Sequence, residues 1–372
     1  MVSCFFHVIH GDPRVAVVHD YVTQRGGAER VVLALLGAFP GARLVTAAYA
    51  PDQSFPEFAG VQVETLWTDR VPPFHRDPRT ALPVLAGAFS RYVVDADVVV
   101  CSTSGWAHGI GGPAARVVYC HNPARWLYQV EDYQGGTPAL ARRAFTRATG
   151  GLRAWDRRAA QRASLYFANS TSVQGRIAAA YGIEAEFLPP PPGLDPSVLD
   201  EPVPGLEPGF LLTVSRPRGY KNTALICKAV EALPGTRLVV VGGLPERRQG
   251  WDPRLTGLVG VADGRLAWLY RNAAGLVAVG REDFGLTPVE SYSFGRPAAV
   301  LRAGGYVDSA APGVATTWIE EPTVAAVTAG IRDLLATVWD TRQIRQHAER
   351  FSLASFQARM VDAVDEVWRR TR

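Results

Sequence analysis

The strongest constraint on the fold is a regular alternation of short apolar runs with longer stretches of helical spacing. Such alternation is typical of parallel α/β layering, in which a helix follows each strand and packs on the sheet. The runs at 98–101 and 238–241 are apolar throughout rather than at every second position. They predict strands in sheets that are covered on both faces.

A proline-rich segment interrupts this alternation once. Residues 188–209 contain eight prolines among 22 residues, too many for a helix or a central strand. We therefore predict an α/β chain of two doubly wound, parallel-sheet domains at 1–190 and 209–351, joined by a linker at 191–208.

The same patterns predict the individual elements. In the first half, strands are expected at 14–19, 43–48, 97–102, 116–121 and 165–169, and helices at 28–39, 80–92, 139–163 and 172–181. In the second half, strands are expected at 210–215, 237–242, 275–280 and 297–301, and helices at 222–233, 263–272, 286–294, 322–338 and 352–370.

Composition excludes several classes of protein. With 372 residues, 47% of them hydrophobic, the chain has enough apolar material for two cores. It has no apolar stretch of the ~18 residues that a membrane span requires, and no signal peptide is expected before Pro13. The four cysteines lie far apart, as is typical of reduced thiols in a cytoplasmic protein.

The positive charge of the chain is not arranged for nucleic acid. The net charge is +4, without a basic stripe interleaved with stacking aromatics, so we expect no nucleic-acid partner. An arginine cluster does lie within residues 142–162, with Asp156 as its only acid. We interpret it as a solvated helix face; the alternative is a peripheral contact with anionic lipid at the inner membrane face, or with an anionic acceptor.

Polar residues follow the predicted strands, where ligands of parallel sheets bind. After the first strand, Gly26 and Gly27 precede a helix; they either let a ligand approach the backbone or make a turn that needs positive φ. His121 follows the strand at 116–121 and precedes a proline. It could donate a hydrogen bond to a substrate hydroxyl or share a proton.

Two cations flank the loop after the first strand of the second domain. Arg216 ends that strand region and Lys221 begins the next helix. Together with helix N–H groups they would bind a diphosphate.

The most informative segment is the run from Glu282 to Glu290. Gly285 allows the chain to turn into a helix, and the N–H groups of residues 284–287 would face a phosphate. The two glutamates, eight residues apart, could accept hydrogen bonds from hydroxyl groups of one ligand.

These residues carry a resemblance to a known family. GGAER at 26–30, CHNP at 120–123, Arg216 with Lys221, and EDFGLTPVE at 282–290 occur in the order seen in the retaining GT-B glycosyltransferases of family 4. The resemblance runs from about Arg14 to the carboxyl terminus. It implies two Rossmann-like domains facing a cleft, with the last helix, 352–372, crossing back to the amino-terminal domain.

The resemblance also implies roles for the residues. Arg216 and Lys221 would neutralise the departing diphosphate, Glu290 would accept from the ribose hydroxyls, and Glu282 would hold hydroxyls of the transferred sugar. Backbone contacts to sugar and phosphate are implied for Asp283, Phe284, Gly285 and Leu286. His121 would hydrogen-bond the sugar across the cleft, and Gly26 and Gly27 would lie near the phosphate and acceptor.

The implied reaction is hexosyl transfer from a nucleotide-sugar to a hydroxyl of a saccharide, lipid-linked or small-molecule acceptor. VVHDY at 17–21 and YCHNPARWLY at 119–128 resemble enzymes that transfer mannose or a related sugar from a GDP-sugar. No cofactor is expected. The string Asp95-Ala96-Asp97 precedes a predicted strand, so we interpret it as a strand-entry feature rather than a metal site.

Two other functions remain open from the sequence: a nucleotide-sugar epimerase on the same fold, and a nucleotide-sugar-binding protein without transfer activity. Loop aromatics that could stack on an acceptor sugar, or anchor their loops instead, are Phe55, Trp67, Phe74, Tyr128 and Tyr133.

Overall fold

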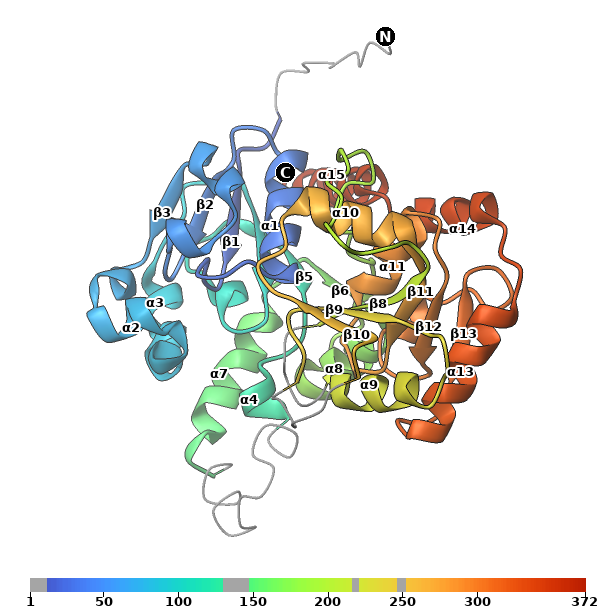
Figure 1. Ribbon diagram of the computed structural model, residues 1–372. Coiled ribbons are helices and arrows are strands. Elements are labelled where there is room, and N and C mark those ends of the chain that lie inside the picture. Colours follow the sequence, from blue (N-terminus) through green and yellow to red (C-terminus); the bar gives the residue numbers. More distant parts are fainter. Residues whose placement is uncertain (1–11, 130–146, 216–220, 246–251) are drawn as a thin grey trace. The chain divides into compact units, whose positions relative to one another are not determined.

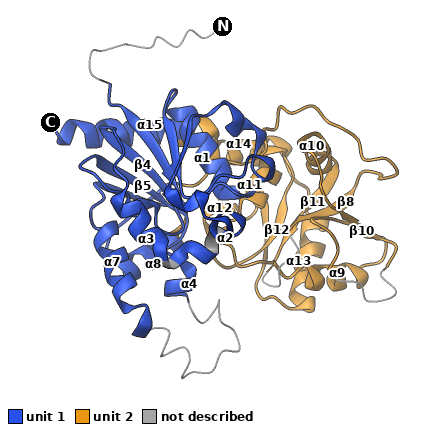
Figure 2. Cartoon of the chain, turned by 90° about the vertical axis from the view of Figure 1, so that its left-hand side faces the viewer, with its two compact units in different colours: residues 1–169, 173–188, 357–372 blue, residues 170–172, 189–356 orange. Residues whose placement is uncertain are grey.

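The computed structural model describes residues 12–129, 147–215, 221–245 and 252–372 (Figure 1). The chain divides into two compact units, coloured separately in Figure 2. Unit 1 comprises residues 1–169, 173–188 and 357–372, and unit 2 comprises residues 170–172 and 189–356.

Unit 1 is built on a parallel sheet with the strand order β3-β2-β1-β4-β5-β6-β7. Its strands are β1 (Val15–His19), β2 (Arg43–Thr46), β3 (Val63–Thr65), β4 (Val98–Thr103), β5 (Ala115–Cys120), β6 (Leu165–Ala168) and β7 (Glu186–Phe187). The α-helices are α1 (Gly27–Ala38), α2 (Pro72–Arg76), α3 (Leu82–Arg91), α4 (Arg125–Tyr128), α7 (Gly150–Ala160) and α8 (Thr171–Tyr181). β1, β4 and β5 are almost wholly buried, as their continuous apolar runs predict.

Unit 2 is built on a second parallel sheet, with the order β10-β9-β8-β11-β12-β13. Its strands are β8 (Phe210–Val214), β9 (Leu238–Val241), β10 (Leu255–Leu258), β11 (Ala273–Ala278), β12 (Ala298–Leu301) and β13 (Thr316–Ile319). The helices are α9 (Thr223–Glu231), α10 (Asp263–Asn272), α11 (Leu286–Ser293), α12 (Tyr306–Ser309), α13 (Val324–Ala336) and α14 (Thr341–Ala348).

The last helix, α15 (Leu353–Arg370), joins unit 1 from residue 357 onward. The Gln357 side-chain amide donates to the Ala34 carbonyl oxygen at 3.0 Å, and Arg359 pairs with Glu186 at 2.5 Å. These observations confirm the predicted fold class of two Rossmann-like, doubly wound domains with a carboxy-terminal helix that returns to the amino-terminal one.

Each sheet changes direction at its centre. In unit 1 the chain runs outward from β1 to β3 on one side, then from β4 to β7 on the other; in unit 2 it does the same from β8 and from β11. The connections that leave the carboxyl ends of the two central strands therefore run in opposite directions. This point is called a topological switch point, and α/β sheets bind ligands there. The pairs β1–β4 and β8–β11 locate the two candidate sites.

The proline-rich segment that we predicted as a linker packs within unit 2. Leu194 is buried in the core of that unit, and the Glu201 N–H donates to the Gly264 carbonyl oxygen at 3.1 Å. Glu201 also pairs with Arg265 at 2.8 Å. The segment thus packs against α10.

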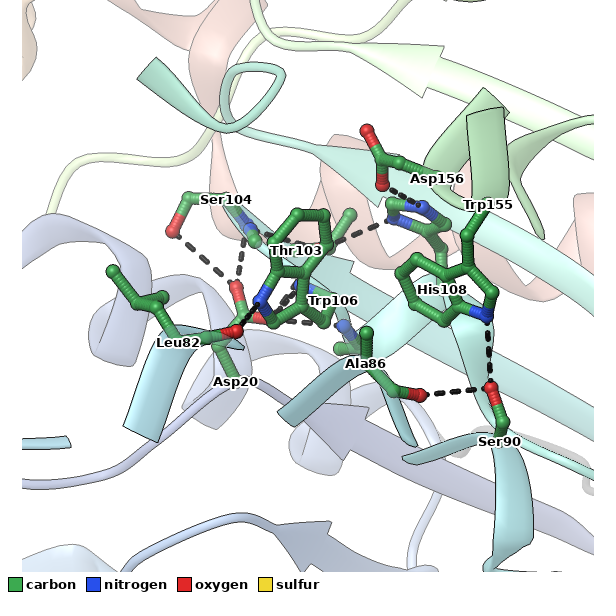
Figure 3. Close-up of polar contacts among 12 residues, drawn as sticks. Asp20, Leu82, Ala86, Ser90, Thr103, Ser104, Trp106, His108, Trp155 and Asp156 are labelled. Atoms are coloured by element: carbon green, nitrogen blue, oxygen red, sulfur yellow. Dashed lines mark hydrogen bonds and ion pairs between the residues drawn. The ribbon is translucent and has the colours of Figure 1, made fainter. Parts of the chain in front are cut away.

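Asp20, directly after β1, organises the turn that follows β4 (Figure 3). Its buried carboxylate accepts from the N–H groups of Ser104 at 2.6 Å, Trp106 at 2.7 Å and Ala107 at 2.9 Å. Sequence reasoning passed over this residue, although a carboxylate beside a strand end is a ready acceptor for turn N–H groups.

We expect Asp20→Ala to lower the free energy of unfolding by about 2–4 kcal/mol, because three buried N–H groups lose their acceptor. Urea unfolding followed by circular dichroism measures the change. Asp52→Ala, at an exposed position, is the matched control and should change stability by less than about 0.5 kcal/mol. Equal stability of the Asp20 variant and this control would contradict the assignment.

The arginine-rich helix α7 has a buried anchor. Asp156 on this helix pairs with His108 at 2.9 Å, and both side chains are almost fully buried (Figure 3). Within the described part of the cluster, the exposed arginines are Arg147, Arg157, Arg158 and Arg162. Arg142 and Arg143 lie outside the described residues. The only acid of the cluster therefore anchors the helix from its buried side, while Arg157 and Arg158 on the same helix are exposed.

Candidate active site

The switch point of unit 2 brings together two of the predicted site residues. Lys221 follows β8 and Glu282 follows β11, and the Lys221 ammonium group forms an ion pair with the Glu282 carboxylate. The two side chains are 21% and 17% exposed. An ammonium group that is mostly buried and ion-paired in this way stays at the strand ends, where it is placed to receive an anion.

A second contact ties the same two loops together. Asn222, next to Lys221, has φ 55°, in the left-handed region, and its side-chain amide donates to the Val279 carbonyl oxygen at 3.0 Å. The neighbouring Arg216 lies outside the described residues, so its predicted partnership with Lys221 stays a prediction.

The loop from Glu282 to Leu286 is shaped by close backbone contacts. Gly285 has φ 86° and caps the amino terminus of α11, whose first N–H groups have no partner within the helix. A Cβ atom on Gly305 would collide with the backbone of Asp283 and Phe284. The Gly305 N–H also donates to the Glu282 carbonyl oxygen at 3.0 Å. Since the helix dipole favours negative charge at this end, the loop suits a phosphate.

Glu290 lies on α11 and is fixed on two sides. One carboxylate oxygen accepts from the Tyr270 hydroxyl at 2.7 Å, and the other accepts from the Gly193 N–H at 3.2 Å. Burial and the carboxylate raise the pKa of Tyr270 well above its usual value, so this hydroxyl stays a donor. The Glu290 carboxylate is thus held in place on α11 by the Tyr270 hydroxyl and the Gly193 N–H.

In unit 1, His121 follows β5, as predicted, and is partly exposed. Its Nε2 atom lies 2.8 Å from the Ser102 hydroxyl oxygen, and its ring contacts the rings of His19 and Tyr119 edge-on. Desolvation of the ring where it packs at the strand ends, with a smaller contribution from His19, lowers the pKa of His121 to about 3. The imidazole is therefore neutral at pH 7.

This pKa predicts how stability depends on pH. Between about pH 6.5 and pH 3 the unfolded chain binds a proton at His121 that the folded chain does not, so stability falls as the pH falls, by up to about 1.4 kcal/mol per pH unit. We expect His121→Asn to reduce that slope by up to about 1.4 kcal/mol per pH unit, which is the contribution of one proton. Urea titrations at pH 6, 5 and 4 measure it, and an unchanged slope would contradict the lowered pKa.

The glycine pair at the start of α1, Gly26 and Gly27, is not a positive-φ turn. Gly26 has φ −134° and precedes the helix, and a Cβ atom there would lie 2.6 Å from a carboxylate oxygen of the buried Glu29. The glycine thus makes space for Glu29, which corrects the alternative that this pair supplies positive φ. Whether a ligand approaches Gly26 and Gly27 stays a prediction.

Some of the aromatic residues in the loops anchor the chain, and others are exposed. Phe55 lies under the Arg30 guanidinium at 3.8 Å, and Tyr128 packs edge-on against Tyr181 at 5.7 Å, so both anchor the chain. Trp67 is 54% exposed, whereas Phe74 packs partly on the core. Tyr133 lies outside the described residues.

Asp95 and Asp97 are both engaged by Arg14. The Arg14 guanidinium lies 3.0 Å from Asp95, and the Arg14 N–H donates to Asp97 at 2.9 Å, which lowers the pKa of Asp97. In the described part of the chain, no cluster of three or more histidine, cysteine or acidic side chains could hold a metal ion. That the reaction needs no metal stays a prediction.

Sequence reasoning missed the residues that hold the predicted ones. Tyr270, Gly193 and Ser102 were not singled out, and His19 was quoted only within the segment at 17–21 without a role, because a buried tyrosine, a glycine and strand-end polar residues have no distinctive spacing. His19 and Ser102 do end the two central strands of unit 1, and that position is the signal that could have found them.

Two parallel-sheet units with polar residues at both switch points define a protein of the two-domain Rossmann-like class. Residues 25–197 match the family model described as Glycosyltransferase Family 4, and residues 200–351 match the one described as Glycosyl transferases group 1. The chain belongs to the GT-B glycosyltransferases that these two models define.

Solved structures show the same fold. Anabaena Alr3699/HepE in complex with UDP-glucose is similar with a TM-score of 0.68 at 17% identity, over 95% of this chain and 99% of that one. Sucrose-phosphate synthase from Thermosynechococcus elongatus is also similar with a TM-score of 0.68 at 17% identity, over 95% of this chain and 99% of that one. WaaG, a glycosyltransferase involved in lipopolysaccharide biosynthesis, is similar with a TM-score of 0.59 at 18% identity, over 94% of this chain and 99% of that one. No curated protein matches the chain by sequence.

Proposed function

We propose that this glycosyltransferase transfers a hexose from a nucleotide-sugar to an acceptor hydroxyl with retention of anomeric configuration, and that unit 2 binds the donor. The observation that carries the proposal is the Lys221–Glu282 ion pair beside the amino terminus of α11. Cationic charge and the amino terminus of a helix at one switch point suit the diphosphate of such a donor.

The roles that we propose come from the family resemblance, and the placement of Lys221 and Glu282 supports them. Lys221, with Arg216, stabilises the negative charge that develops on the departing diphosphate. Glu290 accepts from the ribose hydroxyls, and Glu282 both holds Lys221 and accepts from sugar hydroxyls. Backbone groups of Asp283, Phe284, Gly285 and Leu286 contact sugar and phosphate.

His121 donates a hydrogen bond to the transferred sugar. The acceptor hydroxyl attacks on the side of the leaving group, and a donor phosphate oxygen takes its proton, so no protein carboxylate is needed as nucleophile. Catalysis then consists of leaving-group stabilisation and positioning, without a metal.

We propose mannose or a related hexose on GDP as donor, on the resemblance of the segments at 17–21 and 119–128. The Anabaena relative in complex with UDP-glucose makes UDP-glucose the first competitor to test. For the acceptor we propose a saccharide, lipid-linked or small-molecule hydroxyl, and for the location the cytoplasm, with the exposed arginines of α7 available to an anionic acceptor or membrane. Among the described helices, none combines the length and apolarity needed to cross a bilayer.

Slow transfer to water tests the reaction without a known acceptor. GDP-mannose and UDP-glucose are each incubated with the protein. One-dimensional NMR follows the release of the nucleotide and identifies the anomer of the free sugar that forms first. We expect one donor to release its nucleoside diphosphate and an α-anomer. An epimerised nucleotide-sugar, an inverted anomer, or binding without turnover would overturn the proposal.

A further inference from the structure

Three side chains form a hydrogen-bonded chain at the switch point of unit 1. The register of β1 and β4 pairs His19 with Ser102. His19 Nδ1 lies 2.9 Å from the Ser102 carbonyl oxygen and 3.1 Å from its hydroxyl oxygen, and that hydroxyl lies 2.8 Å from His121 Nε2. His19 and Ser102 are buried, so these contacts decide where their protons lie.

The carbonyl oxygen fixes the first proton. A carbonyl can only accept, so His19 Nδ1 must carry a hydrogen and donate it to Ser102. A protonated Nδ1 cannot accept from the Ser102 hydroxyl. That hydroxyl therefore donates to its other neighbour, His121 Nε2, which must lack a proton.

The charge state of His121 fixes the last proton. Because the lowered pKa keeps the ring neutral at pH 7, one of its two nitrogens carries a hydrogen, and Nε2 is excluded. Nδ1 remains. Within the described part of the chain, this atom has no hydrogen-bond partner and is not buried.

We propose that Ser102 and His19 are positioning residues that lock His121 as its Nδ1–H tautomer, so that it presents a hydrogen-bond donor, and not a base, to the ligand. The inference rests on the proposed function for the role of His121 at the sugar. It narrows that role, since the sugar atom that His121 contacts must be an accepting oxygen. If His121 is locked as a hydrogen-bond donor, it does not act as a base. The proton of the acceptor hydroxyl is then taken by a phosphate oxygen of the nucleotide-sugar.

Nitrogen NMR tests the tautomers directly. Histidine-selective ¹⁵N labelling and a long-range ¹H–¹⁵N correlation at pH 7 report which ring nitrogen carries the hydrogen. The chain has seven histidines, and the signals of interest are identified by their loss in His19→Asn and His121→Asn. We expect a hydrogen on Nδ1 of both rings and none on His121 Nε2. A His19 Nδ1 without a hydrogen, or a His121 Nε2 that carries one, would overturn the proposal.

Ser102→Ala and Ser102→Thr form the matched pair. We expect Ser102→Ala to shift His121 toward the Nε2–H form that the free histidine side chain prefers. Ser102→Thr keeps the hydroxyl, so His121 should stay in the Nδ1–H form. Donor hydrolysis should fall about three- to tenfold in kcat in the alanine variant, with Kd for UDP and GDP unchanged.

An unchanged tautomer in folded Ser102→Ala would contradict the lock, and so would a tautomer change without any fall in kcat. The spectra need no turnover. Absence of hydrolysis in the unaltered protein would therefore count against the proposed function and leave the tautomer result to stand or fall separately.

Discussion

Replacing Lys221 by alanine is expected to weaken nucleoside diphosphate binding roughly 10- to 100-fold, the equivalent of one charge-assisted contact of about 1.5–3 kcal/mol. Donor turnover should fall further, by about 10²–10³-fold, because the charge on the leaving diphosphate is greatest in the transition state. The reason lies in the ion pair with Glu282, which fixes the ammonium group between the ends of β8 and β11. Calorimetric titration with UDP and GDP measures the binding loss.

Lys228 supplies the matched control. It is the only other lysine in the chain, and it lies exposed on α9, the helix that follows Lys221. Lys228→Ala makes the same chemical change without touching the switch point, so it should bind nucleotide as the unaltered protein does. Equal weakening in both variants would mean that general charge, and not the position of Lys221, governs binding.

Replacing Glu290 by alanine is expected to have two separable effects. The buried Tyr270 hydroxyl loses its acceptor, which lowers the free energy of unfolding by about 1–3 kcal/mol. The ribose also loses a carboxylate, which weakens nucleotide binding by about tenfold or more. Urea unfolding and calorimetric titration measure the two effects on the same sample.

A double variant separates them. Adding Tyr270→Phe to Glu290→Ala removes the unsatisfied hydroxyl, so most of the lost stability should return. Nucleotide binding should remain weak, because the carboxylate is still absent. Recovery of binding in the double variant would show that Glu290 acts only as a structural partner of Tyr270.

The central part of each sheet could be predicted from the sequence, and the edges could not. The buried strands β4, β9 and β12 are continuous apolar runs, and the pattern predicts them because burial on both faces demands such runs. β3, β7, β10 and β13 were not predicted. They are the outermost strands, of two to four residues each, and a half-covered edge leaves little apolar signal.

The candidate site shows a similar division. Lys221, Glu282 and Glu290 stand in a recognisable order along the chain, so sequence reasoning found them. Their partners come from distant segments: Gly193 contacts Glu290 from 97 residues away, and Ser102 reaches His121 from another strand. Such partners depend on strand register and helix rotation, and spacing along the chain does not encode either.

The most direct test of the donor site is a thermal-shift series with GDP, UDP, ADP and dTDP, each with EDTA present, on the unaltered protein and on Lys221→Ala. A diphosphate site at the switch point of unit 2 predicts that one nucleotide raises the melting temperature of the unaltered protein and that the shift disappears in the variant. No shift with any of the four nucleotides, or a shift that survives loss of Lys221, would contradict it.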